Sequence, residues 1–232
     1  MSIFPGGVAL SDLEVYDWEA EDGCRGGSPH LHTASSEGYV VIGGSGAVQT
    51  LSAAGFAEDR LAVGDVLWFT PGVVHRLIND GDLRLLVVMS NAGLPEAGDA
   101  VLTFPSAVLD DPAAYATAAA LPAGTGRADA ARARRDLALC GFAELRDAGP
   151  GALPALHRRA VALVQPKVAG WRVLWRSTVL AETERTGERL EMLAAGDGSA
   201  LADAAVTRVA PTGAQRGHGM CGMLRTWEWP AG

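Results

Sequence analysis

Four residues of this chain carry side chains that bind transition metals. Residues 29–37 contain His30, His32 and Glu37, and residues 71–75 end in His75. Successive side chains of a β-strand point to opposite faces, so His30 and His32 would project from the same face. Three imidazole nitrogens and one carboxylate oxygen suit Fe(II), Mn(II), Zn(II), Ni(II) or Cu(II). We therefore expect one divalent metal ion, and the ligand set leaves its identity open.

The glycines around these ligands resemble those of the cupin superfamily. The two cupin motifs run approximately G-x5-H-x-H-x3,4-E-x6-G and G-x5-P-x-G-x2-H-x3-N, and the segment from about residue 23 to residue 91 follows them. The matching residues are His30, His32, Glu37 and Gly44 in the first motif and Gly64, Gly72, His75 and Asn79 in the second. Cys24 replaces the leading glycine, and Pro71 lies one place late. The resemblance implies an intact metal site at His30, His32, Glu37 and His75.

The elements that must position these ligands are short strands. Apolar or alternating segments at 39–42, 48–51, 66–69 and 83–89 predict strands, and Gly43-Gly44 and Asp80-Gly81 predict turns between them. Many short strands favour a sandwich or a barrel, where inward and outward residues alternate. We predict a mainly β fold: a cupin-like double-stranded β-helix, or jelly-roll, barrel followed by an α-helical C-terminal region.

Composition divides the rest of the chain. We assign residues 1–105 to the barrel with its metal site, 106–126 to a linker with a short helix, 127–205 to a helical extension, and 206–232 to a tail that packs on the barrel as a strand or loop. The segment 92–105 is rich in glycine and proline, so an extended crossing segment without a regular element is expected there. Asp110-Asp111-Pro112 predicts a helix start, and Pro166 predicts a kink.

Several aromatic, histidine and arginine side chains outside the ligand set could have functional roles. Trp171 and Trp175 recur at helical spacing, which favours packing of an amphipathic helix over ligand binding. His157 suits a surface or capping role, and His218 lies in a glycine-rich tail that suits closure of the barrel. Arg76 follows His75 directly and should point away from the ligands.

Charge and cysteine content exclude several classes of protein. The chain has 19 Lys and Arg against 27 Asp and Glu, a formal charge of −8, which opposes binding to nucleic acids or anionic membranes. The three cysteines are widely separated and form no C-x-x-C pair, so a reducing cytoplasm is the simplest location. No apolar segment is long enough to predict a membrane span.

The predicted ligands indicate metal-dependent chemistry, but they do not determine which reaction takes place. Open coordination positions would admit a substrate, and the resemblance implies Fe(II) dioxygenation, Mn(II) decarboxylation or sugar isomerisation among the chemistries of such sites. We expect an Fe(II)-dependent oxygenase or oxidoreductase acting on a small polar metabolite, with Val41, Trp68 and Phe69 keeping the pocket dry. A redox-neutral isomerase, epimerase or decarboxylase and a non-catalytic metabolite-binding module are the alternatives. The resemblance also suggests a homodimer.

Overall fold

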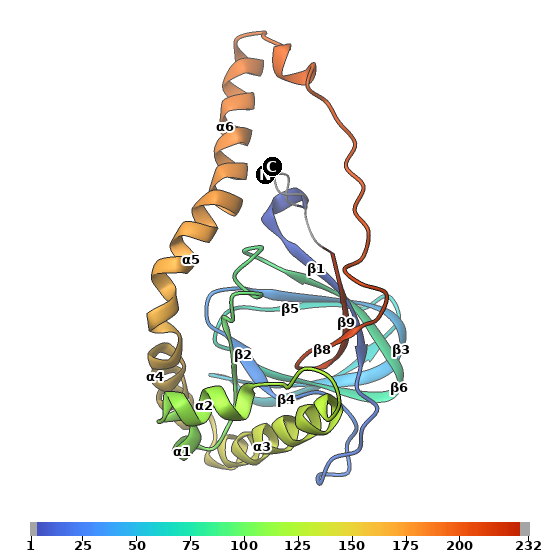
Figure 1. Cartoon of the computed structure of the whole chain (residues 1–232), viewed down its shortest axis with the longest axis vertical. Coiled ribbons are helices and arrows are strands. Elements are labelled where there is room, and N and C mark those ends of the chain that lie inside the picture. The colour runs from blue at the N-terminus through green and yellow to red at the C-terminus, as the bar shows by residue number, and fades with distance from the viewer. Residues whose placement is uncertain (1–3, 228–232) are drawn as a thin grey trace.

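The computed structural model describes residues 4–227, and its centre is an antiparallel β-barrel (Figure 1). Within these residues one nine-stranded sheet has the order β4-β3-β6-β1-β9-β8, while β2 pairs with β6 and β7, and β5 pairs with β3. The strands are β1 (Ala9–Val15), β2 (His30–His32), β3 (Glu37–Ser52), β4 (Gly55–Ala62), β5 (Val66–Phe69), β6 (Val74–Met89), β7 (Ala100–Leu102), β8 (Gly217–His218) and β9 (Gly222–Thr226).

Two long strands replace the shorter ones that the sequence predicts. The expected turns at Gly43-Gly44 and Asp80-Gly81 are wrong, because β3 and β6 each continue for 16 residues and pair with each other throughout. The pairing register shifts between Val41 and Gly46 instead, which is the signature of bulges. Gly44 has φ +67°, and a Cβ there would lie 2.2 Å from the carbonyl oxygen of Asp82. The glycines thus bend a continuous strand where sequence alone suggests a chain reversal.

The barrel wall separates two apolar cores. Tyr39, Val41 and Leu85 belong to the core inside the barrel, in alternation with residues on the outer face. Leu31 and Leu51 belong to a second core, which the barrel shares with residues of the helical region such as Phe142. The ligand strand β2 is therefore held from both sides, with His30 and His32 flanking an outward-facing Leu31 that the helices cover.

The segment 92–105 contains a strand that the sequence does not predict. Residues 100–102 form β7, which pairs with β2 in the register His30–Leu102, Leu31–Val101 and His32–Ala100. The expectation of a segment without a regular element is thus wrong for these residues. Residues 92–98, which include Gly93 and Gly98, form turns. Glycine and proline mark the turns correctly, but three strand residues are too few for a recognisable alternation.

Helices follow the barrel from residue 106 onward. They are α1 (Ser106–Leu109), α2 (Pro112–Ala119), α3 (Arg127–Ala148), α4 (Leu153–Val164), α5 (Val168–Trp175) and α6 (Ala181–Ala194). The side chain of Asp111 caps α2 by accepting hydrogen bonds from the backbone N–H groups of Ala113 and Ala114, at the predicted helix start. A short 3-10 turn at Gln165–Lys167 separates α4 from α5, at the predicted Pro166 kink.

The helical region both covers the barrel and extends beyond it. Trp171 is buried in the shared core and its Nε1 donates to the carbonyl of Ala97 (3.3 Å), so its role is packing. Figure 1 shows α6 projecting away from the barrel and the chain returning to form β8 and β9. β9 pairs with β1, which lays part of the tail on the barrel, and residues 228–232 of the predicted tail lie outside the described residues. No described helix is long and apolar enough to cross a membrane.

Candidate metal centre

Three strands bring the four predicted ligands together. β2 carries His30 and His32, β3 begins at Glu37, and β6 carries His75, which pairs directly opposite His30. One ligating atom from each of these residues lies within 4.8 Å of the others, and all four residues are buried. The four side chains that the sequence singles out thus form a single cluster that could hold one metal ion.

The far nitrogens of the imidazoles are held by acceptors. The Nδ1 of His30 lies 2.9 Å from the carbonyl oxygen of Ser28, and that of His75 lies 3.1 Å from the carbonyl oxygen of Val73. The Nδ1 of His32 lies 2.7 Å from Oδ1 of Asp99. An acceptor at Nδ1 requires the proton on Nδ1, which leaves Nε2 of a neutral ring with a lone pair. Metal-binding histidines are commonly oriented in this way.

The Nε2 atoms of two histidines lie close to the same carboxylate oxygen. The Nε2 of His75 lies 2.8 Å from Oε2 of Glu37, and the Nε2 of His32 lies 3.2 Å from the same oxygen. No hydrogen bond joins His75 Nε2 to Glu37 Oε2 in the described residues, and both atoms are buried. Two lone pairs at this separation repel each other unless a proton or a metal ion lies between them. The donor set of three nitrogens and one oxygen therefore fits a divalent metal.

The charges around the cluster favour the ligating forms of two residues. Burial lowers the pKa of His30 well below its usual value, and the neighbouring His75 and His32 lower it further, so this ring is neutral. For Glu37, burial opposes ionisation, but the neighbouring imidazoles of His75 and His32 outweigh that effect and hold its pKa well below the usual range. Glu37 is therefore a carboxylate.

His32 behaves differently because it lies between two carboxylates. Burial lowers its pKa, but the hydrogen bonds to Asp99 and Glu37 outweigh that effect and raise the pKa to about 10. In the metal-free protein a proton on His32 therefore supplies the positive charge between Asp99 and Glu37. A divalent metal bound at Nε2 would have to displace this proton.

Asp99 is the residue of the site that sequence reasoning missed. It is fully buried, its Oδ1 lies beside His32, and its Oδ2 accepts a hydrogen bond from the backbone N–H of Ser35 (2.9 Å). Burial raises its pKa, but the contacts with His32 and Ser35 outweigh this and lower it. Asp99 fixes the orientation of His32 from 67 residues away along the chain. Its only signal in the sequence is an acid between Gly98 and the short β7.

Of the three residues expected to shield the site, two are buried in the core inside the barrel. Val41 and Phe69 are buried, and the ring of Phe69 stacks on His75 with centroids 4.6 Å apart and planes 7° apart. Trp68 is 72% exposed, so its expected role in the pocket is wrong. Glu37 pairs with Phe69 across β3 and β5, which turns Phe69 inward and the adjacent Trp68 outward. Tyr39 adds a buried hydroxyl without a hydrogen-bond partner among the described residues.

A cavity of about 330 Å³ opens onto the ligands. Its walls include His30, His32 and Glu37 of the cluster and apolar side chains of the barrel such as Val87 and Met89. The tail closes another side, since residues 218–221 and 224 also line the cavity. Cys221 is buried there, with Sγ 4.0 Å from Nδ1 of His30, and burial raises the pKa of its thiol.

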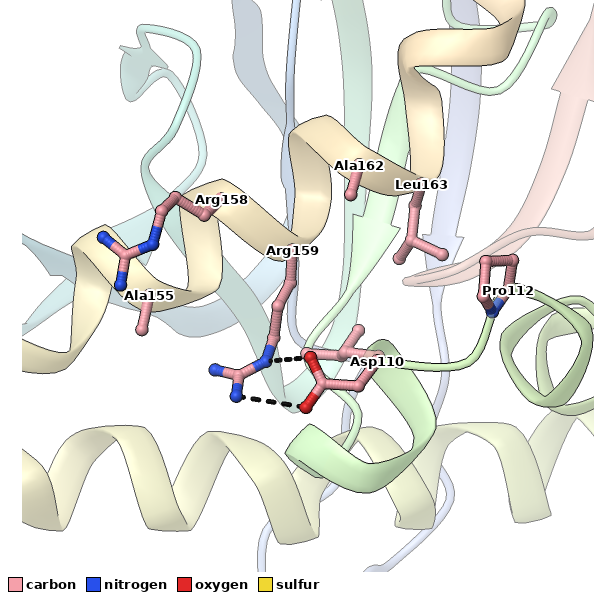
Figure 2. A pocket seen from close by; sticks show the side chains of 8 residues that line it. Asp110, Pro112, Ala155, Arg158, Arg159, Ala162 and Leu163 are labelled. Carbon is pink, nitrogen blue, oxygen red and sulfur yellow. Dashed lines mark hydrogen bonds and ion pairs between the residues drawn. The ribbon is translucent and has the colours of Figure 1, made fainter.

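Other side chains considered from the sequence lie elsewhere. Arg76 is buried outside the ligand cavity and forms an ion pair with Asp22. His157 contacts the carbonyl oxygen of Gly72 through Nε2 (2.9 Å). Figure 2 shows a separate pocket of about 340 Å³, where Arg159 contacts Asp110 through two nitrogen–oxygen pairs at 2.7 and 3.2 Å. Its lining includes no histidine, so it lacks the ligands of the barrel site.

Known structures resemble this chain at low identity. An uncharacterized conserved protein with a double-stranded β-helix domain from Klebsiella pneumoniae is 16% identical, with a TM-score of 0.32 over 39% of this chain and 73% of that one. The nucleoside dehydratase Pac13 from Streptomyces is 14% identical, with a TM-score of 0.33 over 43% and 70%. A predicted oxalate decarboxylase from Thermotoga maritima is 21% identical, with a TM-score of 0.27 over 36% and 64%.

A comparison with models of protein families identifies the domain that contains the metal cluster. Among curated proteins, none matches this sequence significantly. Residues 17–89 match the model of the cupin domain, and this segment contains all four clustered ligands and the strands β2 to β6 that carry them. Residues 17–89 of this chain therefore form a cupin domain.

Proposed function

We propose that this protein is a mononuclear metal-dependent enzyme that acts on a small polar metabolite. The observation that carries the proposal is the buried pair His75 Nε2 and Glu37 Oε2, which lie 2.8 Å apart and have no hydrogen bond between them. A divalent metal bound between these two atoms would satisfy both of them. A cavity opens onto His30, His32 and Glu37 of the cluster, so a bound metal would be accessible to a small molecule.

We propose Fe(II) as the metal and oxygenation or a related oxidation as the reaction. Mn(II), Zn(II) and Ni(II) also suit the donor set. When bound, Fe(II) would supply redox chemistry and a Lewis acid beside the cavity. Glu37 contributes a negative charge to the centre, and Asp99 keeps Nε2 of His32 directed inward. The apolar walls at Val87 and Met89 limit the entry of water to the cavity.

Oxygen consumption tests this proposal. The purified protein is loaded separately with Fe(II), Mn(II), Zn(II) and Ni(II), and oxygen uptake is measured over a panel of small polar metabolites. We expect substrate-dependent uptake with Fe(II) and none with the Zn(II) form. The matched variant His75→Ala should lose the uptake, and Trp68→Ala, on the exposed face, should keep it. Turnover that proceeds equally well without oxygen would contradict oxygenation and favour redox-neutral chemistry. Metabolite binding without any turnover would contradict an enzyme.

A further inference from the structure

Arg134 extends from the helical region into the cavity of the metal cluster. It lies on α3, outside the segment that matches the cupin domain, and it lines the same cavity as His30, His32 and Glu37. The residue is only 8% exposed. The helical extension thus contributes a guanidinium to a site whose ligands all come from the barrel.

The contacts of Arg134 are incomplete. Its Nη2 donates to the carbonyl oxygen of Gly219 at 2.6 Å, and its Nη1 has a long contact of 3.4 Å with the carbonyl oxygen of Ala119. Its Nε is buried and has no partner within the described residues. Neither carbonyl carries a formal charge, so the guanidinium charge is held by neutral groups alone.

The other buried arginines have the carboxylate partner that Arg134 lacks. Among residues 4–227, Arg76 and Arg135 are the other arginines with the lowest exposure, and each forms an ion pair, with Asp22 and Asp136 respectively. Arg216, nearly as buried, pairs with Asp12. Burial of an arginine charge is costly, and a carboxylate usually offsets that cost. Arg134 has no such carboxylate partner among the described residues, and its side chain lines the cavity.

We propose that Arg134 binds a carboxylate group of the substrate while another part of the same molecule reaches the metal ligands. This inference rests on the proposed metal-dependent function. Nε and a neighbouring Nη of arginine form an edge that matches the two oxygens of a carboxylate. A singly charged carboxylate fits better than a dianionic phosphate, because Glu37 and Glu96 also line the cavity and would repel additional negative charge. Arg134 therefore selects for small carboxylic acids.

Binding of matched chelators tests the role of Arg134. The protein is loaded with Co(II) and titrated calorimetrically with the monohydroxamic acids of succinate and glutarate, whose hydroxamate binds metals. Each is compared with the analogue that ends in a carboxamide. We expect at least one carboxylate compound to bind about 10 to 100 times more tightly than its amide, the range for a hydrogen-bonded charge. Arg134→Gln should abolish this preference, while Arg132→Gln, which changes an exposed arginine of the same helix, should preserve it.

The outcomes separate this inference from the proposed function. If the protein binds Co(II) but the wild type prefers neither carboxylate compound over its amide, the role of Arg134 is overturned and the metal site stands. A preference that persists in Arg134→Gln overturns it as well. If the wild type binds no Co(II), the proposed function itself fails. Because the wild-type titrations need no variant, the inference stays testable even if Arg134→Gln fails to fold.

Discussion

The stability of the metal-free protein should depend on pH through His32. Its pKa in the folded protein is about 10, against 6.5 for an unperturbed histidine, because Asp99 and Glu37 accept hydrogen bonds from its protonated ring. A raised pKa means that the folded protein binds the proton more tightly than the unfolded chain. The resulting stability is fully present below pH 6.5 and is lost as the pH rises towards 10.

The magnitude follows from proton linkage. One proton that is held by the folded protein alone changes the free energy of unfolding by about 1.4 kcal/mol per pH unit. Between pH 7 and pH 8.5 the metal-free protein should therefore lose about 2 kcal/mol. Below this pH window, the lowered pKa of His30 also makes the free energy of unfolding depend on pH. Above the window, the thiol of Cys221 contributes as well, because its pKa is raised in the folded protein and it ionises first in the unfolded chain.

Urea denaturation of chelator-treated protein at several pH values measures this effect. His32→Gln lacks the titrating group and should show a much flatter dependence. Asp99→Asn should also be flatter, since His32 loses one of its two carboxylate partners. Metal-loaded wild type should lack the slope because its His32 is already deprotonated. A wild-type free energy of unfolding that stays constant from pH 7 to pH 8.5 would refute the proposed proton between Asp99 and Glu37.

Further predictions concern the metal, the site wall and the assembly. Binding of one divalent metal at pH 7.5 should release about one proton, from His32, which calorimetry in two buffers of different ionisation enthalpy can measure; no release would contradict the pKa of His32. Phe69→Ala should lower the free energy of unfolding by about 3 to 5 kcal/mol in urea denaturation, against about 0.5 kcal/mol or less for Trp68→Ala, and equal losses would contradict their opposite orientations. We also expect a homodimer, so sedimentation at the monomer mass of 24.0 kDa would argue against it.

Residues close together in sequence made part of the site predictable. His30, His32 and Glu37 follow a local spacing, and His75 stands at a fixed place in a second glycine framework. Their clustering agrees with the sequence prediction because both motifs position strands of one barrel. The strand pattern was harder to interpret, since Gly43-Gly44 produces a bulge within β3 where a turn was expected.

Residues that reach the site from distant segments could not be predicted in this way. Asp99 contacts His32 across 67 residues, and no periodic pattern links the two positions. Arg134 belongs to a helix that also carries the exposed Arg132, so its sequence does not show which arginine faces the cavity. Trp68 and Phe69 are both large and apolar, and only the pairing of Phe69 with Glu37 shows which one points inward.

Metal content tests the central claim most directly. Protein purified without chelators is reloaded with Fe(II) under anaerobic conditions, freed of unbound metal, and analysed for metal per chain. We expect about one ion per chain for the wild type, the same for His157→Gln, which changes a histidine outside the cluster, and a clear loss for His75→Ala. Circular dichroism establishes that each variant is folded. Wild type that retains no metal, or a folded His75→Ala variant that retains as much as the wild type, would contradict a metal centre at His30, His32, Glu37 and His75.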